Sequence, residues 1–213
     1  MQARLLAVNV VHALIPGPKE TGLTAIDKRP RDGRVAVGEL GLAGDSVCDT
    51  KHHGGPDQAL YVYAREDSDW WAAELDREIP FGLFGENLDT EGLDISGAMI
   101  GERWRIGDGD EAVEVEVRSP RIPCVTFQAR MGLDGWVKRF TRAGRPGAYL
   151  KVLRTGSIAA GDAVSVLHRP GHGVVIRHLL AGMEPDQARE LLASGVDLDP
   201  YVSSLAERVA ARQ

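Results

Sequence analysis

The stretch AVEVEVRSPRIPC, residues 112–124, carries the clearest structural pattern in the sequence. Three valines alternate with Glu114 and Glu116 in its first half. Because successive side chains of a β-strand point to opposite faces, the valines share one face and the two carboxylates share the other. The pattern predicts a half-buried strand over Ala112–Arg118 that leads directly into a segment stiffened by Pro120 and Pro123.

Short segments with strand character recur on both sides of this stretch, each bounded by Gly, Pro, Asp or Asn. They cover residues 5–11, 35–37, 59–63, 99–100, 104–106, 149–153 and 163–167. One convincing helical pattern spans residues 65–76, and a weaker one surrounds residues 127–140. Many short strands with few helices between them favour a closed or strongly curved sheet over a doubly wound parallel one, so the first domain is predicted to be mainly β.

The character of the sequence changes after Pro170-Gly171-His172-Gly173. Residues 185–192 and 200–212 both begin with a proline and continue with helix formers, and the second segment places three apolar side chains on one stripe. We therefore expect a first domain over residues 1–168 and a short helical appendage over residues 169–213. About forty residues of short helices bury little area by themselves, so the appendage should pack on the first domain or on a second subunit, as in a homodimer.

The composition is that of an ordinary globular protein, and the formal net charge of -6 argues against a general nucleic-acid-binding surface. No apolar run approaches the length of roughly 18 residues that a membrane span requires. The N-terminal segment lacks a convincing secretory signal, so we expect a cytoplasmic protein. In that reducing compartment the two cysteines, Cys48 and Cys124, are expected to remain thiols.

Cys124 is the first candidate for chemistry, because it follows a strand within a proline-fixed loop. Arg121, three residues earlier, would favour the thiolate form electrostatically. A lone cysteine is more often a buried packing residue, and the spacing alone does not decide between these two interpretations.

A second candidate segment, residues 41–45 followed by residues 51–60, places two glycine turns around a pair of histidines. Glycines let the backbone approach a ligand closely, but the segment could equally be an ordinary turn with exposed histidines. Cys48 and His52 suggest a zinc site, yet no second pair of ligands lies at a suitable spacing, which disfavours that interpretation.

Two further segments carry polar groups that a site could use. Glu86 and Asn87 follow a glycine; they could cap a turn, bind a polar heterocycle or move a proton. A cationic cluster contains Lys28, Arg29 and two further arginines. Such clusters are usually solvated surfaces, but in an acidic protein this one could hold a phosphate.

Taken in order, five of these segments resemble the successive signatures of the MOSC domain family. They are residues 41–45 (GLAGD), 53–57 (HGGPD), 84–88 (FGENL), 120–124 (PRIPC) and 161–162 (GD). The resemblance covers roughly residues 1–168 and implies a β-barrel fold. The helical tail, together with residues 24–30, is similar to the bacterial branch linked with resistance to 6-N-hydroxylaminopurine.

The resemblance implies that Cys124 binds the molybdenum of a molybdopterin cofactor. It also implies a reductase that removes the hydroxyl oxygen of N-hydroxylated bases or amines as water, which would detoxify N-hydroxylaminopurine. Arg121 would lie beside the cysteine as a positive charge. The remaining residues assigned by the resemblance would line the pocket or move a proton (His53, Glu86, Asn87) or bind the cofactor and its phosphate (His53, Asn87, Lys28, Arg29).

The sequence offers no further redox cofactor. Two cysteines are too few for an iron–sulfur cluster, and no G-x-G-x-x-G turn signals a flavin or NAD(P)H site. An oxidoreductase of this kind would need an external electron-donating reductase besides its small-molecule substrate. Two other functions remain open: Cys124 could carry a persulfide, since the family also occurs fused to cofactor sulfurases, or the chain could bind the cofactor without turnover.

Overall fold

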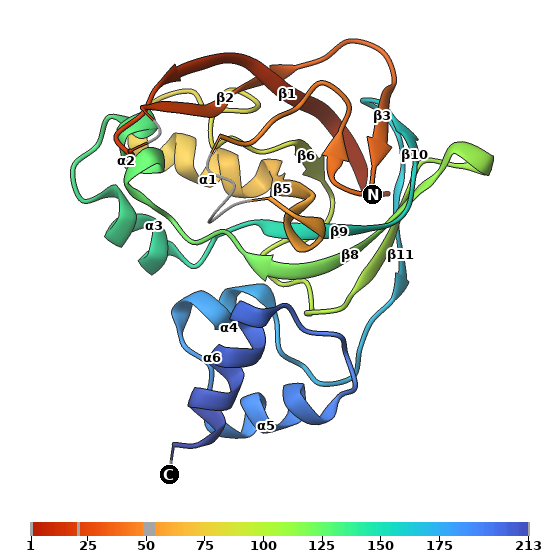
Figure 1. Ribbon diagram of the computed structural model, residues 1–213, viewed down its shortest axis with the longest axis vertical. Coiled ribbons are helices and arrows are strands. Elements are labelled where there is room, and N and C mark those ends of the chain that lie inside the picture. Colours follow the sequence, from red (N-terminus) through yellow and green to blue (C-terminus); the bar gives the residue numbers. More distant parts are fainter. Residues whose placement is uncertain (1, 21, 49–53, 213) are drawn as a thin grey trace.

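An eight-stranded mixed sheet organises the computed structural model, which describes residues 2–20, 22–48 and 54–212. All neighbouring strands in it are antiparallel except β5 and β6, which are parallel. The order across the sheet is β11 (Val164–His168), β7 (Arg103–Ile106), β8 (Val113–Pro120), β9 (Ala148–Arg154), β5 (Leu60–Ala64), β6 (Leu88–Glu91), β1 (Arg4–Pro16) and β2 (Leu23–Pro30). A smaller sheet contains β10 (Gly156–Ile158), β3 (Val35–Gly38) and β4 (Gly41–Leu42) (Figure 1).

Strand β8 confirms the prediction from its alternating sequence and also corrects it. Its three valines are completely buried in the main hydrophobic core. The opposite face was predicted to be solvated, but from Glu116 to Pro120 it is buried as well. Glu116 is only 5% exposed, because it pairs with Arg103 and Arg118. Strand β8 therefore carries buried side chains on both faces over most of its length.

The expected β-barrel is not confirmed. In the ladder order the main sheet has two ends, β11 and β2, and within the described residues β2 pairs with β1 alone. The N-terminal end of β1 reaches the chain just before β11 through an isolated bridge between Arg4 and Ala163. The rest of β1 pairs with β6 and then with β2, so this contact does not extend into a closing ladder. The sheet is mixed and open.

Three helices cover one side of the sheet: α1 (Arg65–Leu75), α2 (Val125–Met131) and α3 (Trp136–Ala143). The first confirms the predicted helix, and the weaker pattern over residues 127–140 becomes two helices separated by Gly132 and Gly135, which both adopt positive φ. Aromatic side chains fill the space beneath them, with the rings of Trp71 and Trp136 4.6 Å apart. These contacts form a second hydrophobic cluster, distinct from the main core.

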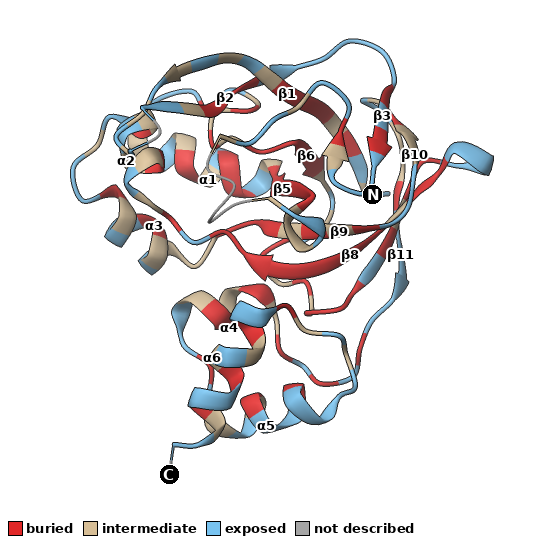
Figure 2. Cartoon of the chain, viewed as in Figure 1, coloured by how far each residue is buried: buried red, intermediate tan, exposed pale blue. Residues whose placement is uncertain are grey.

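The C-terminal segment forms α4 (Ile176–Ala181), α5 (Pro185–Ala193) and α6 (Pro200–Ala210) beneath the sheet (Figure 1). Its first residues bind the chain after β6: Ile176 N–H donates to Ala98 O over 2.9 Å, and Ile100 N–H donates to Val174 O over 3.2 Å. The predicted strand at residues 99–100 is therefore only an isolated bridge from Met99 to Val175. Apolar side chains of all three helices belong to the same core as the sheet, and the helix faces turned toward it are buried (Figure 2). The domain boundary at residue 168 stays a prediction.

The guanidinium of Arg118, only 1% exposed, joins the sheet to the tail and to the loop before β5. Its Nη1 donates to Glu116 Oε1 over 2.7 Å and also to the backbone oxygen of Asp197 in the tail. Its Nε lies 2.8 Å from Oδ1 of Asp57, which belongs to the short 3₁₀ helix η1 (Pro56–Gln58). A single buried cation therefore has hydrogen-bond acceptors in two segments and an ion-pair partner in a third.

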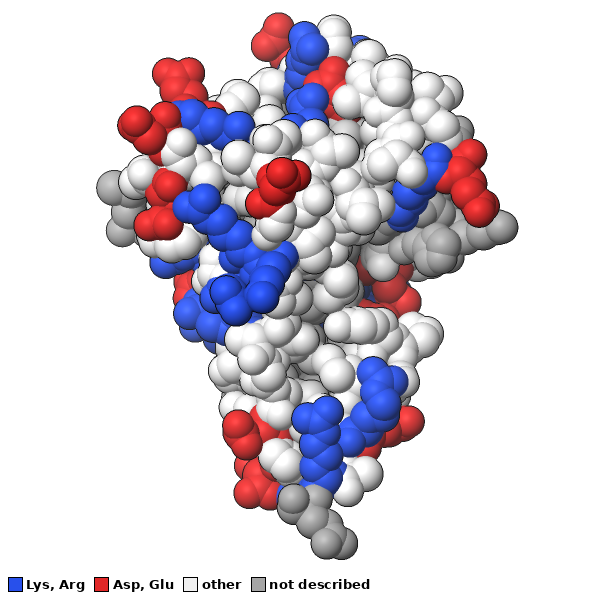
Figure 3. All heavy atoms as spheres, turned by 90° about the vertical axis from the view of Figure 1, so that its left-hand side faces the viewer, with Lys and Arg blue, Asp and Glu red and all other residues white. Residues whose placement is uncertain are grey.

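Other Lys and Arg side chains lie exposed at the surface, unlike the buried Arg118. Helix α3 exposes Lys138, Arg139 and Arg142, and it lies on the face where Lys and Arg side chains gather in Figure 3. Arg139 pairs there with Glu74, with almost half of each side chain exposed. Among the described residues, none of the helices has the length and apolar character needed to cross a membrane.

Deleting residues 174–213 should expose the apolar surface that the tail covers. The truncated protein should aggregate or change its oligomeric state, because the tail's buried side chains share the main core with the sheet. Light scattering of the purified protein checks this. A truncated chain that stays soluble with the mass of the full-length form would contradict it.

Replacing Arg118 with Met should lower the free energy of unfolding by about 3–5 kcal/mol, because it leaves buried Glu116 without its inner partner. The matched control is Arg103→Ala, which removes a partner of the same carboxylate whose side chain is 53% exposed. That control should cost only about 0–1 kcal/mol. Urea unfolding of both variants measures the two changes in the free energy of unfolding. Equal decreases in that free energy would argue against a special role for Arg118.

Candidate functional site

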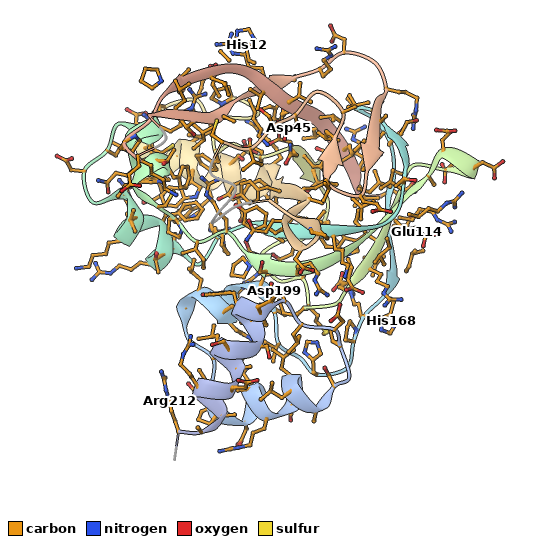
Figure 4. All side chains as sticks on the ribbon, in the orientation of Figure 1. His12, Asp45, Glu114, His168, Asp199 and Arg212 are labelled. Carbon is orange, nitrogen blue, oxygen red and sulfur yellow. The ribbon has the colours of Figure 1, made fainter. Side chains whose placement is uncertain are left out.

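A cavity of about 230 Å³ opens between β2, β5, β9 and the loop that follows β8. Its walls come from strand ends and loops, so residues distant in sequence meet there. The polar and charged side chains among its lining residues are Lys19, Thr24, Lys28, Asp45, Ser46, Cys48, Gln58, Tyr61, Asn87, Arg121, Cys124, Thr126 and Tyr149. Asp45 lies among the strands of the sheet region, far from the helical tail (Figure 4).

Cys124 lines this cavity at the point where the loop after β8 ends. The residue has an extended backbone, with φ of −134°, and α2 begins at the next residue. Cys124 is half-buried: it packs against the second hydrophobic cluster and also borders the cavity. The position combines a fixed backbone with access from the cavity.

Arg121 lies beside Cys124 and is 7% exposed. Its guanidinium carbon lies 3.9 Å from the ring centre of Phe127 and 5.1 Å from that of Tyr61. It also donates a hydrogen bond to the backbone oxygen of Phe84. Because these partners are rings and a carbonyl rather than a carboxylate, they hold the cation in place without neutralising it.

A second set of polar groups forms a connected network around Asp45. Its Oδ2 accepts from Lys28 Nζ over 2.6 Å and from Asn87 Nδ2 over 2.7 Å, and its Oδ1 accepts from Val11 N–H over 3.0 Å. Burial lowers the pKa of Lys28, and the attraction of Asp45 opposes that shift. Asn87 also accepts from Tyr61 N–H over 3.1 Å, so both ends of its amide are engaged.

Two tyrosines complete the inner wall. The rings of Tyr61 and Tyr149 lie 5.3 Å apart, and the Tyr61 hydroxyl donates to Pro146 O over 2.9 Å. Burial raises the pKa of both phenols, and that of Tyr61 lies well above its ordinary value, although Arg121 opposes the shift. Both therefore stay protonated near neutral pH.

Glu86 lies behind the wall rather than on it. Its side chain is buried, and its Oε1 accepts from Gly82 N–H over 2.6 Å. Gly82 has φ of +79°, and a Cβ there would overlap the backbone of Lys28, so glycine allows this loop to pack against β2. Burial raises the pKa of the Glu86 carboxyl.

The structure brings together part of the predicted site. Cys124, Arg121, Asn87 and Lys28 line the same cavity, whereas Arg29 does not. Arg29 is the neighbour of Lys28 on β2, so its side chain points to the other face, where it is 58% exposed and pairs with Asp27. His53 lies outside the described residues. The roles assigned to these residues stay predictions.

Several lining residues were not assigned a role from the sequence, above all Asp45, Tyr61, Tyr149 and Cys48. Asp45 ends the GLAGD segment quoted above, so a signal was present, but nothing in that segment identifies its partners. The tyrosines alternate with apolar residues in strands and look like core residues. Among the described residues no group of three or more His, Cys, Asp or Glu side chains could hold a metal ion.

Comparisons with known proteins identify the family. The family model described as MOSC domain matches residues 49–165. Protein YflK of Bacillus subtilis is 35% identical over 154 residues, which cover 72% of this chain and 68% of that protein. Protein YiiM of Escherichia coli is 33% identical over 165 residues, covering 76% of this chain and 72% of YiiM. A Gibberella moniliformis protein named "Reductase" is 35% identical over 150 residues. The match covers 69% of this chain but only 26% of that longer protein.

Solved structures share the fold. The crystal structure of YiiM from Geobacillus stearothermophilus matches with a TM-score of 0.77 and 24% identity, covering 98% of this chain and 100% of that one. YiiM from Escherichia coli matches with a TM-score of 0.73 and 24% identity, covering 99% and 94% of the two chains. The family match over more than half of the chain and these relatives show that this chain is a YiiM-like member of the MOSC domain family.

Proposed function

We propose that this chain binds a molybdenum cofactor through Cys124 and reduces N-hydroxylated bases or amines. The observation that carries the proposal is the cavity itself, in which a half-buried thiol lies beside the buried cation Arg121. An adjacent positive charge favours the thiolate form of a cysteine. A thiolate is a soft ligand of the kind that suits molybdenum already held by the dithiolene sulfurs of a pterin.

The charges of the cavity wall fit such a cofactor. Lys19, Lys28 and Arg121 supply three cations against the single carboxylate of Asp45 among the lining residues that the structure describes. This excess of positive charge suits a group that carries a phosphate and two thiolates. Lys28 is already paired with Asp45, so it would contribute its field and its remaining N–H donors. Arg29 is turned to the opposite face and is the weaker candidate for a direct contact.

When bound, the cofactor supplies two-electron chemistry in which the N–O bond breaks and, with two protons, the oxygen leaves as water. The chain's own residues prepare the site. Arg121 would favour the thiolate of Cys124, and the neutral phenol of Tyr149 can donate a hydrogen bond to a ligand oxygen, whereas the Tyr61 hydroxyl already donates to Pro146 O. The amide of Asn87 is already engaged with Asp45 and Tyr61, so its part is to fix the wall rather than to grip a substrate.

The relatives support a reductase role in general rather than a particular substrate. One of them is named "Reductase", although the matched part is about a quarter of it. The likeness to YiiM accords with the branch linked to 6-N-hydroxylaminopurine resistance, and the proposed substrates follow from that link. We further propose a separate electron-donating reductase as partner.

Replacing Cys124 with Ser should abolish molybdenum retention while leaving the fold intact, because Ser matches the shape but lacks the soft sulfur donor. The loss should exceed the roughly 10–100-fold that removal of an outer-shell partner costs. Elemental analysis of protein from a cofactor-competent host measures it.

Cys48→Ser is the matched control, since Cys48 lines the same cavity and should be dispensable. Full molybdenum content in Cys124→Ser would overturn the ligand assignment. The same preparation separates the alternatives: molybdenum without turnover indicates a cofactor carrier, and a Cys124 persulfide without molybdenum indicates sulfur transfer.

The purified chain should reduce a hydroxylamine with reduced viologen but not with NADPH, because its sequence shows neither a dinucleotide-binding turn nor cysteines enough for an iron–sulfur cluster. Adding a flavoprotein or ferredoxin-type reductase should restore NADPH-dependent turnover. Stoichiometric NADPH oxidation by the homogeneous chain alone would contradict this.

A further inference from the structure

Two carboxyl groups, those of Glu86 and Asp89, are buried together behind the cavity wall, and each is only 1% exposed. One oxygen of each group has a donor. Gly82 N–H donates to Glu86 Oε1 over 2.6 Å, and Asn9 Nδ2 donates to Asp89 Oδ2 over 2.7 Å. The other two oxygens, Glu86 Oε2 and Asp89 Oδ1, are buried with no donor among the described residues.

The two carboxyl groups act on each other, and they are close enough to form a hydrogen bond if one of them carries a proton. Two ionised carboxylates cannot form such a bond, because both only accept, and two like charges in contact repel each other strongly when buried. A single proton between them removes the repulsion and satisfies both orphaned oxygens. We infer that Glu86 and Asp89 form a buried acid–carboxylate pair that holds one proton. The inference goes beyond the proposed function and does not require a bound cofactor.

The surroundings indicate which member carries the proton. Glu86 interacts with two cations, Arg121 from the loop before α2 and Lys28 from β2, whereas the one cation that acts on Asp89 is Arg65 of α1 among the interactions that the structure describes. The neighbouring groups on β5, Tyr61 and Tyr63, are protonated phenols, and Asn9 on β1 is neutral.

Burial raises the pKa of both carboxyls, and repulsion by Glu86 adds to the rise at Asp89, whose pKa lies well above its ordinary value. Because the cations Arg121 and Lys28 favour the charged form of Glu86, the proton resides on Asp89 and the negative charge resides on Glu86.

With this assignment Asp89 influences the charge of the cavity, although Asp89 does not line the cavity. With the proton in place the pair carries one negative charge, so Lys19, Lys28 and Arg121 still exceed Asp45 and the pair by one positive charge. Loss of the proton would add a second negative charge behind the same wall and weaken its attraction for an anion. Asp89 is thus a positioning residue that acts through Glu86.

Stability as a function of pH tests the pair. Because the folded-state pKa is raised above the unfolded value near 4, the stabilisation is complete below that value and is lost as pH rises through the folded-state pKa. The unfolding constant of the wild type should therefore rise by up to about tenfold per pH unit within that window, relative to a variant without the proton. Asp89→Asn and Glu86→Gln each provide such a variant, since one amide N–H replaces the shared proton.

Both single variants should fold and lose this pH dependence. Urea unfolding at about pH 5 to 9, a range between the ordinary pKa values of carboxyl groups and phenols, would record the loss. The double variant should be less stable than the sum of the single changes, because two amides cannot satisfy Gly82 N–H, Asn9 Nδ2 and each other at once. Infrared absorption should show a protonated carboxyl group at neutral pH in the wild type that is absent from Asp89→Asn.

Asp67→Asn is the matched control. Asp67 is also buried, but its two oxygens are satisfied by Arg145 and by Ser96 Oγ, so an amide there should destabilise the protein. Parallel pH profiles of wild type and Asp89→Asn, additive single changes, or no protonated carboxyl absorption would each overturn the inference. Failure of both single variants to fold would overturn it too, because the amides reproduce the proposed hydrogen bond.

Discussion

The buried guanidinium of Arg118 is the interaction on which the arrangement of this molecule depends. A charge removed from water is tolerated when hydrogen bonds and opposite charges compensate it, and Arg118 has hydrogen-bond acceptors on β8 and in the tail and an ion pair with Asp57 of η1. Glu116 could not be buried without it. Because these partners belong to separate segments, the tail and the loop before β5 have to settle in one position relative to the strand.

This constraint reaches the cavity along two short routes. Arg118 stands three residues before Arg121 on a chain that ends β8 and turns through two prolines to Cys124. On the other side it holds Asp57, whose neighbour Gln58 lines the cavity and accepts a hydrogen bond from Gly54 N–H over 3.3 Å. Among the described residues the helical tail does not line the cavity, yet it helps to fix the backbone that presents Cys124 and Arg121.

The alternating sequence of β8 was sufficient to predict that strand and its buried face, since side-chain period is a local property. The burial of Glu116 was not predictable, because it depends on a tail more than sixty residues away and on the pairing of Arg118. Sheet closure was mispredicted for a similar reason: strand content does not determine which strands lie at the edges. Within the site, Cys124 and Arg121 were predicted from the sequence because prolines flank them. The role of Asp45 was not predicted, because it depends on contacts with Lys28 of β2 and Asn87 of the loop before β6.

The charged groups of the site are of two kinds: some are neutralised by a direct partner, and others are not. Asp45 and Lys28 neutralise each other across 2.6 Å, and Asn87 holds that pair without adding charge. Glu86, with the proton on Asp89, contributes one negative charge behind the wall. Arg121 is bound directly by aromatic rings and a carbonyl, and its positive charge lies beside Cys124. A fixed cation of this kind, supported from behind by a single carboxylate, favours a thiolate at Cys124 without forming an ion pair that would withdraw the cation from it.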